Sequence, residues 1–303
     1  GRWIHRQEKY DAAVEAGAVG FVFRNHIEGT LPPTGSIGDA EGPGAIPAVG
    51  VSKELGTRLV RHCEGEVAAK LAVEARTEPT TSQNVTGVTG PETGEQILVT
   101  AHHDAHDIAE GANDNGAGSA LVAEVGRLLS QVELGTTVRC VTFGAEEVGL
   151  FGSEEMAATA DCDRIRAVVN LDGIGESRNL RVATHGFDAL GEAFETLDPA
   201  LTAGVTVDDG LVPHSDHWPF VERGVPGAMV SSDSGADRGW GHTHADTLDK
   251  LDRRDFREIA VVVAAAVARL AEPDRTTEHA SPETIAERAA DREDIEIDVG
   301  ADE

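Results

Sequence analysis

The chain has 303 residues, 40% of them hydrophobic, which is enough for one large domain or two unequal ones with a sizeable core. Its formal net charge of −29 at pH 7 argues against nucleic acid or an anionic membrane surface as a partner. The sequence contains no run of about 18 apolar residues, so no membrane span is expected.

Lysine is scarce in this acidic sequence. It occurs only at Lys9, Lys53, Lys70 and Lys250, and arginine supplies the other basic residues. Because charge of one sign repels itself unless salt screens it, we interpret the composition as adaptation to molar salt. An acidic protein from an ordinary environment is the plainer alternative.

The start of the chain and its cysteines bear on where the protein works. No signal peptide is recognisable, but the sequence begins with Gly1 instead of methionine, so a missing or processed N-terminal piece is expected. The three cysteines follow no spacing motif, which favours packing as small apolar residues over a disulfide framework. We expect a cytoplasmic protein, or a secreted one if the missing piece carries a signal.

Residues 1–80 are predicted to form a small separate unit. Its pattern predicts a helix at Tyr10–Ala16, a buried strand at Gly17–Phe23 and a loop rich in glycine and proline at Gly29–Pro47. A second strand at Ile46–Ser52, a second helix at Lys53–Cys63 and a closing strand at Val67–Val73 are predicted to follow. No cluster of potential metal ligands occurs in this unit.

Residues 81–272 are predicted to form an α/β domain with a mostly parallel sheet. A continuous apolar run predicts a strand at Ile97–Ala101, and further strands are predicted at Val138–Phe143, Ala167–Leu171 and Gly227–Val230. Helical patterns lie between or after them, at Gly116–Ser130, Gly152–Ala160, Asp188–Leu197 and Asp255–Glu272. Strands that alternate with helices indicate this fold class.

Residues 273–303 are acidic and poor in apolar side chains. They are predicted to be an acidic C-terminal tail, in which Ser281 and Glu283 open a short helix and Glu296–Glu303 is solvated.

Histidines and carboxylates occur where the predicted strands end or in the loops that follow. They are His102, Asp104, Asp114, Glu146, Glu147, Asp172 and His242. Sites in α/β sheets form beyond the carboxyl ends of the strands, so we expect these side chains to meet. This ligand mixture suits two zinc ions that share a carboxylate, with another carboxylate left as a base. Such a site would hydrolyse an amide bond.

Several assignments stay open at this level. His102 and Asp104 lie on the same face of an extended segment, so the imidazole can bind zinc while the carboxylate accepts the proton of its other ring nitrogen. His103 and His106 compete with His102 for the ligand role. Asp114 precedes a helix, so it is either an N-cap or a carboxylate that bridges two cations.

The remaining candidates also allow alternatives. The adjacent Glu146 and Glu147 would repel each other unless cations lie nearby, so one is expected to bind metal and the other to transfer protons. Asp172 ends a buried strand, where its charge requires a partner. His242 and His244 are equally suitable ligands by chemistry alone.

The segments from residue 81 to 271 resemble metallopeptidase family 28, the di-zinc exopeptidases. The most specific piece is Phe143–Ser153, which reads FGAEEVGLFGS, and four further motifs match in the same order. These are AHHD from Ala101, GANDN from Gly111, NLD from Asn170 and HTHADT from His242. Residues 1–80 resemble the protease-associated domain that often accompanies this family, through Gly17–Gly20 and Ile46–Ser52, although the domain begins partway through its usual extent.

The resemblance implies a three-layer α/β/α exopeptidase fold and a role for each site residue. It implies five ligands for two zinc ions: His102, a bridging Asp114, Glu147, Asp172 and His242. It also implies Glu146 as general base and Asp104 as the carboxylate behind His102. The segment Ser215–Phe220 resembles a family segment too, so Asp216 is expected either to support the site by hydrogen bonding or to stabilise its loop. Cobalt or manganese are possible substitutes, since oxygen and nitrogen ligands accept several metals.

The function that this resemblance favours is an aminopeptidase acting on peptides with a free N-terminus. A carboxypeptidase or dipeptidase of the same family would need a cation for the substrate carboxylate, and Arg178, Arg223 and Arg238 are candidates. Glutaminyl cyclases share much of the fold but usually use one zinc. A non-catalytic binding module predicts eroded ligands, and an unrelated metal-dependent deacylase is the remaining alternative.

Overall fold

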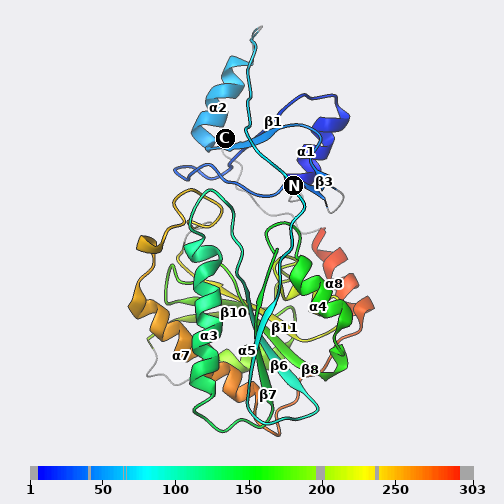
Figure 1. The fold of residues 1–303 in the computed structure, drawn as a ribbon, viewed down its shortest axis with the longest axis vertical. Helices are drawn as coiled ribbons and strands as arrows, with labels where there is room; N and C mark the ends of the chain where they lie inside the picture. Colours follow the sequence, from blue (N-terminus) through cyan, green and yellow to red (C-terminus); the bar gives the residue numbers. More distant parts are fainter. Residues whose placement is uncertain are drawn as a thin grey trace.

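The computed structural model describes residues 6–39, 42–63, 65, 67–195, 202–235 and 239–293. A small N-terminal unit lies at one end of a larger α/β domain (Figure 1). In the described part of the chain, no helix has the length and apolar character needed to cross a membrane.

A seven-stranded sheet with the order β10-β9-β11-β8-β6-β7-β5 forms the centre of the larger domain. Its strands are β5 Val85–Thr89, β6 Gln96–His102, β7 Thr137–Phe143, β8 Ile165–Leu171, β9 Leu180–Ala183, β10 Val205–Asp208 and β11 Gly227–Ser232. The pairs β6–β7, β6–β8, β8–β11 and β9–β10 are parallel, whereas β9–β11 and β5–β7 are antiparallel. The expected mixed, mostly parallel sheet is therefore confirmed.

Strand β6 lies between β7 and β8, and its register fixes the position of the candidate site. Ile97 is paired with Val138 on one side and Ala167 on the other. Residues 97–102 are buried throughout, which explains the continuous apolar run typical of a parallel strand covered on both faces. Because these strands are parallel, their carboxyl ends meet at one edge of the sheet.

Helices cover both faces of the sheet and produce three layers. Helices α3 (Ala117–Leu129), α5 (Asp188–Glu195) and α7 (Arg253–Leu270) share one large apolar core with the sheet. Helices α4 (Phe151–Thr159) and α6 (Trp218–Val221) enclose a second core. The end of the helix predicted over 188–197 lies outside the described residues.

The N-terminal unit is built around two short parallel strands. Its elements are α1 Arg6–Glu15, β1 Phe21–Arg24, β2 Gly38–Asp39, β3 Gly42–Pro43, β4 Ala48–Val51 and α2 Lys53–His62. Strand β1 pairs with β4 in parallel, and β2 pairs with β3 antiparallel. Tyr10 joins the unit internally, because its buried hydroxyl donates to the carbonyl of Ile46 at 2.9 Å.

One predicted strand is wrong. Residues 67–84 contain no strand, and Val67 and Val73 are 58% and 45% exposed. In the described part of the chain, residues 67–73 pair with no strand, although Leu71 lies beside Gly20 at the start of β1. Without such pairing an extended segment is not held as a strand by backbone hydrogen bonds. The cysteines are all free, with Cys63 exposed and Cys140 and Cys162 half-buried.

The segment after α7 differs from the solvated tail expected from its composition. His279 Nε2 lies 2.9 Å from the carbonyl oxygen of Ile165, and Arg288 donates to the carbonyl of His185 at 2.9 Å. A short helix, α8 (Pro282–Glu293), follows Ser281 as predicted, and its Ile285 is buried in the large core. Residues 296–303 lie outside the described residues.

Candidate metal centre

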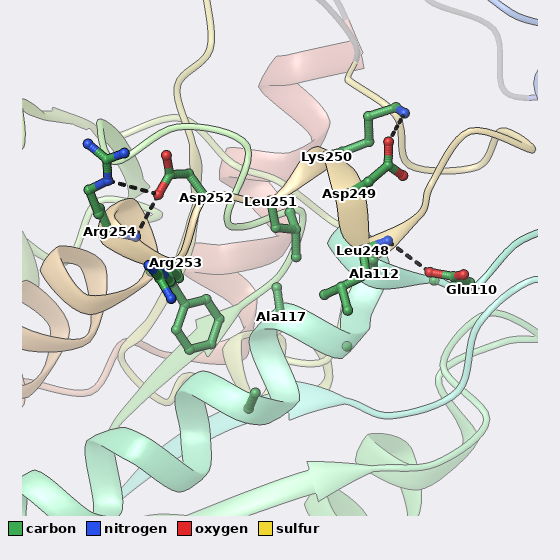
Figure 2. Close-up of a pocket in the computed structure, with 14 residues that line it drawn as sticks. Glu110, Ala112, Ala117, Leu248, Asp249, Lys250, Leu251, Asp252, Arg253 and Arg254 are labelled. Carbon is green, nitrogen blue, oxygen red and sulfur yellow. Dashed lines mark hydrogen bonds and ion pairs between the residues drawn. The ribbon is translucent and has the colours of Figure 1, made fainter.

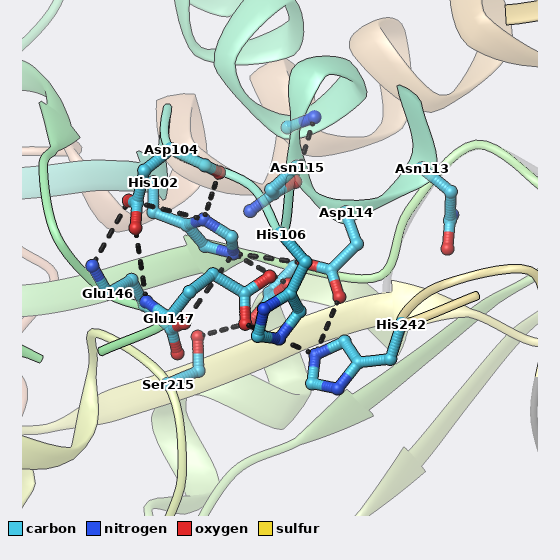
Figure 3. Close-up of polar contacts among 12 residues, drawn as sticks. His102, Asp104, His106, Asn113, Asp114, Asn115, Glu146, Glu147, Ser215 and His242 are labelled. Atoms are coloured by element: carbon cyan, nitrogen blue, oxygen red, sulfur yellow. Dashed lines mark hydrogen bonds and ion pairs between the residues drawn. The ribbon is translucent and has the colours of Figure 1, made fainter. Parts of the chain in front are cut away.

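The predicted ligands converge at the carboxyl edge of the sheet, and Figure 3 shows His102, Asp114, Glu147 and His242 together. His102 is the last residue of β6, while Glu146 and Glu147 follow β7 and Asp172 follows β8. Asp114 belongs to the short helical turn η1, Ala112–Gly116, which leads into α3. His242 comes from the loop after β11 and has a left-handed backbone with φ of 59°.

His102 is surrounded by carboxylates. Its Nε2 atom lies 3.1 Å from Asp114 Oδ1, 3.4 Å from Asp172 Oδ1 and 4.0 Å from Glu146 Oε2. Two ligands bound to one tetrahedral zinc at about 2.0–2.1 Å lie roughly 3.3 Å apart. The separations from His102 to Asp114 and Asp172 therefore fit one zinc site.

His242 forms a second group on the other side of Asp114. Its Nε2 atom lies 3.1 Å from Asp114 Oδ2 and 3.3 Å from Glu147 Oε2, again separations that fit ligands of one zinc. Asp114 thus directs one carboxylate oxygen toward each histidine, which is the arrangement required of a bridging ligand. All five predicted ligands are brought together.

The neighbouring histidines differ in their positions relative to the cluster. His103 and His244 are exposed and take no part in the cluster. His106 does belong to it, because its Nε2 lies 2.8 Å from Glu147 Oε2 and its ring packs edge-on against His242 with centroids 4.6 Å apart. Together His106, Glu147 and His242 offer ligand atoms within 4.8 Å of one another.

Asp104 acts differently from the expected partner of the His102 ring. The backbone carbonyl of Asp104 lies 3.0 Å from His102 Nδ1, whereas its carboxylate oxygen lies 3.7 Å away. The carboxylate instead accepts the backbone N–H groups of Glu146 and Glu147, at 3.1 and 3.2 Å. Asp104 therefore fixes the loop that carries the two glutamates.

Asp246 is a site residue that sequence reasoning missed. Its two oxygens accept the backbone N–H groups of Asn113 and Asp114 at 2.6 and 3.0 Å, and the residue is 2% exposed. It therefore fixes the backbone of the predicted bridging ligand. The signal was available in the HTHADT motif, where Asp246 follows His242 by four residues.

Asp172 is held by Ser215, whose hydroxyl donates to Asp172 Oδ2 at 2.5 Å. Asn170 in turn donates to Ser215 Oγ at 2.8 Å. Asp216 was expected to support the site by hydrogen bonding, but the described residues show no hydrogen bond from it to a predicted ligand. It is fully buried, and burial raises the pKa of Asp216 to about 7 despite the opposing charge of His102.

The charges in the cluster are strongly coupled. Burial raises the pKa of Glu146 well above its ordinary value, and Asp172 and Asp216 add to this effect against the opposing charge of His102. Burial would also raise the pKa of Glu147, but contacts with His106 and His242 lower it to about 2. Such opposed shifts between adjacent carboxylates are typical of functional sites and favour different roles for the two glutamates.

The cluster opens into a cavity of about 440 Å³. Asp114, Glu146, Glu147 and Asp172 all line it, and so do residues of the N-terminal unit. A larger cavity of about 940 Å³ lies between the start of α3 and residues 248–256 (Figure 2). It contains none of the predicted ligands, so the smaller cavity is the candidate active site.

Comparison with known families matches residues 84–267 to "Peptidase family M28" and residues 3–59 to "PA domain". The first match spans more than half of the chain and includes every predicted ligand. The chain belongs to peptidase family M28. The second match assigns the N-terminal unit to the PA, or protease-associated, domain.

Curated relatives of this M28 peptidase are named aminopeptidases. Aminopeptidase YwaD of Bacillus subtilis is 31% identical over 275 residues, which cover 86% of this chain and 59% of that protein. Leucine aminopeptidase 2 of Trichophyton equinum is 30% identical over 238 residues, covering 72% of this chain and 47% of the relative. The chain therefore spans only about half to three fifths of the length of these relatives.

Solved structures of aminopeptidases have the same fold. An aminopeptidase from Aneurinibacillus sp. strain AM-1 superposes with a TM-score of 0.69 at 29% identity, covering 90% of this chain and 68% of that one. A zinc aminopeptidase from Bacillus subtilis gives 0.70 at 28% identity, covering 90% and 69%. A glutaminyl cyclase from an Acidobacteriales bacterium, at 22% identity and a TM-score of 0.51, is similar in fold alone.

Proposed function

We propose that this chain is a zinc-dependent exopeptidase that removes N-terminal residues from peptides. The observation that carries the proposal is the position of Asp114, with one carboxylate oxygen 3.1 Å from each of His102 Nε2 and His242 Nε2. A carboxylate between two histidines, with further carboxylates on both sides, is the donor set of a two-zinc hydrolase.

In this proposal His102 and Asp172 would hold one zinc, Glu147 and His242 would hold the other, and Asp114 would be shared between them. Such ions would polarise the scissile carbonyl and make the attacking water more acidic. His102 is buried and His242 half-buried among carboxylates, so the cluster is suited to concentrated positive charge.

Glu146 is the proposed general base. Its carboxylate lines the cavity and lies 4.0 Å from His102 Nε2, and it is not needed to complete either ligand set. A pKa above the ordinary value suits a group that accepts a proton from the attacking water and returns it to the leaving amine near neutral pH. The backbone N–H of Glu146 is held by Asp104, which keeps this side chain in place.

An aminopeptidase is favoured over a carboxypeptidase by the charges around the site. The cavity wall formed by the cluster is acidic, which suits the ammonium group of a free N-terminus. Arg178 and Arg223 are paired with Glu258 at 3.9 Å and Glu154 at 3.6 Å and do not line the cavity. Arg238 lies outside the described residues.

Hydrolysis of leucine p-nitroanilide in molar salt tests the proposal, with the N-acetylated analogue assayed in parallel. Cleavage of the free-amine substrate alone is the expected result. Cleavage of the acetylated substrate at a similar rate would reject an aminopeptidase, and inactivity toward both by zinc-loaded protein would favour a carboxypeptidase.

A further inference from the structure

The cavity beside the metal cluster has a second wall, contributed by the PA domain. The residues of that wall are Arg6, Lys9, Phe23, Asn25, His26 and Ser36. Whereas the cluster wall is acidic, this wall carries two permanent cations. A peptide in the cavity therefore meets negative charge on one side and positive charge on the other.

A hydrogen bond links the PA domain to the loop that carries His242. The backbone N–H of Thr34 donates to the carbonyl of His242 at 2.8 Å. Behind this loop, a Cβ atom added at Gly50 would lie 1.8 Å from the carbonyl oxygen of Pro33, so only glycine allows strand β4 to approach the loop this closely. The loop is thus held between β4 and the loop of the predicted ligand.

Most polar groups of the wall are engaged in maintaining it. Arg6 donates from Nε to the carbonyl of Ser36 at 3.3 Å. The Asn25 amide donates to Thr30 Oγ1 at 2.8 Å and to the carbonyl of Leu31 at 3.2 Å. These groups shape the loop, which makes them poor candidates for binding a substrate.

Lys9 differs from them. Its ammonium lies 5.5 Å from the centroid of the Phe23 ring, a contact that positions the cation without neutralising it. The side chain is exposed and lines the cavity. Lysine occurs at only four positions in this chain of net charge −29, so the placement of one of them at the active-site cavity has a marked local effect on an otherwise acidic surface.

We propose that Lys9 determines specificity by binding a carboxylate of the substrate. The inference rests on the proposed aminopeptidase function, which places the substrate amine at the acidic wall. The carboxylate belongs either to the C-terminus of a short peptide or to an acidic side chain beyond the scissile bond. The net negative charge of the protein repels a substrate carboxylate, so binding that carboxylate requires a cation close to it.

The test compares kcat/KM for two matched pairs of substrates at one fixed salt concentration. Leucylglycine against leucylglycinamide measures preference for a C-terminal carboxylate, and leucyl-aspartate amide against leucyl-asparagine amide measures preference for an acidic side chain. The variants are Lys9→Met, which retains the stem without the charge, and Lys9→Arg, which retains the charge. Lys70→Met is the control, because Lys70 is exposed and does not line the cavity.

In one of the two pairs, the native protein should cleave the carboxylate substrate with a kcat/KM about fivefold higher than that of its neutral partner, as expected for a partly exposed ion pair. The Lys9→Arg and Lys70→Met variants should show the same preference. Lys9→Met should remove that preference, and the affected pair identifies the source of the carboxylate. Ratios near one in the native protein, or a preference that survives Lys9→Met, would overturn the inference while cleavage of leucine p-nitroanilide left the aminopeptidase proposal intact. Absence of cleavage for every free-amine substrate would overturn both.

Discussion

Thr34 of the PA domain donates its backbone N–H to the carbonyl oxygen of His242, a predicted zinc ligand, at 2.8 Å. His242 has a left-handed backbone with φ of 59°, a conformation that is uncommon for a residue other than glycine and persists when its surroundings hold it. The contact links the smaller domain directly to the geometry of the metal cluster.

Replacing Thr34 with proline removes this donor, whereas Thr34→Ala retains it. Loss of one hydrogen bond of about 1 kcal/mol should weaken zinc binding at the His242 side roughly fivefold and lower kcat/KM with it. Zinc titration and leucine p-nitroanilide kinetics of both variants measure the effect. Equal behaviour of the two variants would show that the PA domain does not position His242.

Asp246→Asn tests the contact that fixes the backbone of Asp114. Asparagine offers one carbonyl oxygen where two backbone N–H groups require acceptors. Loss of a residue that orients a metal ligand is expected to reduce zinc affinity and kcat/KM by about 10- to 100-fold. Asp249→Asn is the matched control in the same region, since Asp249 bonds to Thr247 and Lys250 instead. Native-like zinc affinity in Asp246→Asn would assign Asp246 to loop stability alone.

The site was largely predictable because of how its strands are buried. Strands β6 and β8 are buried over nearly their whole length and are largely apolar. Candidate ligands lie at or shortly after the ends of β6, β7 and β8. The parallel arrangement then brings these ends together. For the same reason His102 could be placed in the cluster, whereas the choice between His242 and His244 depended on the family motif.

Other features depended on contacts between distant segments and were not predictable. The short strands β9 and β10 and the edge strand β5 lack long apolar runs, and residues 67–73 alternate like a strand without a partner. The Asp104 carboxylate accepts the backbone N–H groups of Glu146 and Glu147 instead of binding the His102 ring, because the loop after β7 brings these donors to it. Likewise, Ile285 is buried by elements that precede it by many residues.

Glu146→Gln distinguishes a general base from a ligand. The amide cannot accept the proton, so turnover should fall by about 10² to 10⁴ while zinc content stays unchanged. Glu147→Gln is the contrasting variant and should lose zinc along with activity. Kinetics and metal analysis of the two proteins decide the assignment, and undiminished turnover in Glu146→Gln would exclude it as the base.

Metal removal should reveal a pH dependence of stability. Burial disfavours the charged form of His242, but Asp114 and Glu147 outweigh this effect and raise the pKa of His242 to about 10. The folded state binds this proton more tightly than the unfolded chain does. Protonated His242 therefore contributes fully to the free energy of unfolding below the ordinary histidine pKa of about 6.5. This contribution is lost as the pH rises through 10.

Thermal unfolding of EDTA-treated protein between pH 6 and 10 measures this dependence. The melting temperature should fall as the pH rises across this range. The fall should be smaller in His242→Ala than in His244→Ala, because His244→Ala leaves the contacts of His242 with Asp114 and Glu147 intact. A melting temperature that rises with pH in both variants would contradict the stated role of the His242 proton.

The most direct test of the two-zinc site is the zinc content of the purified native protein, measured together with that of His242→Ala and His244→Ala. His242 Nε2 lies 3.1 Å from the shared Asp114 carboxylate, whereas His244 is exposed. We predict two zinc ions per chain in the native protein and in His244→Ala, and fewer in His242→Ala. One zinc per native chain, or a larger loss in His244→Ala than in His242→Ala, would contradict the proposed centre.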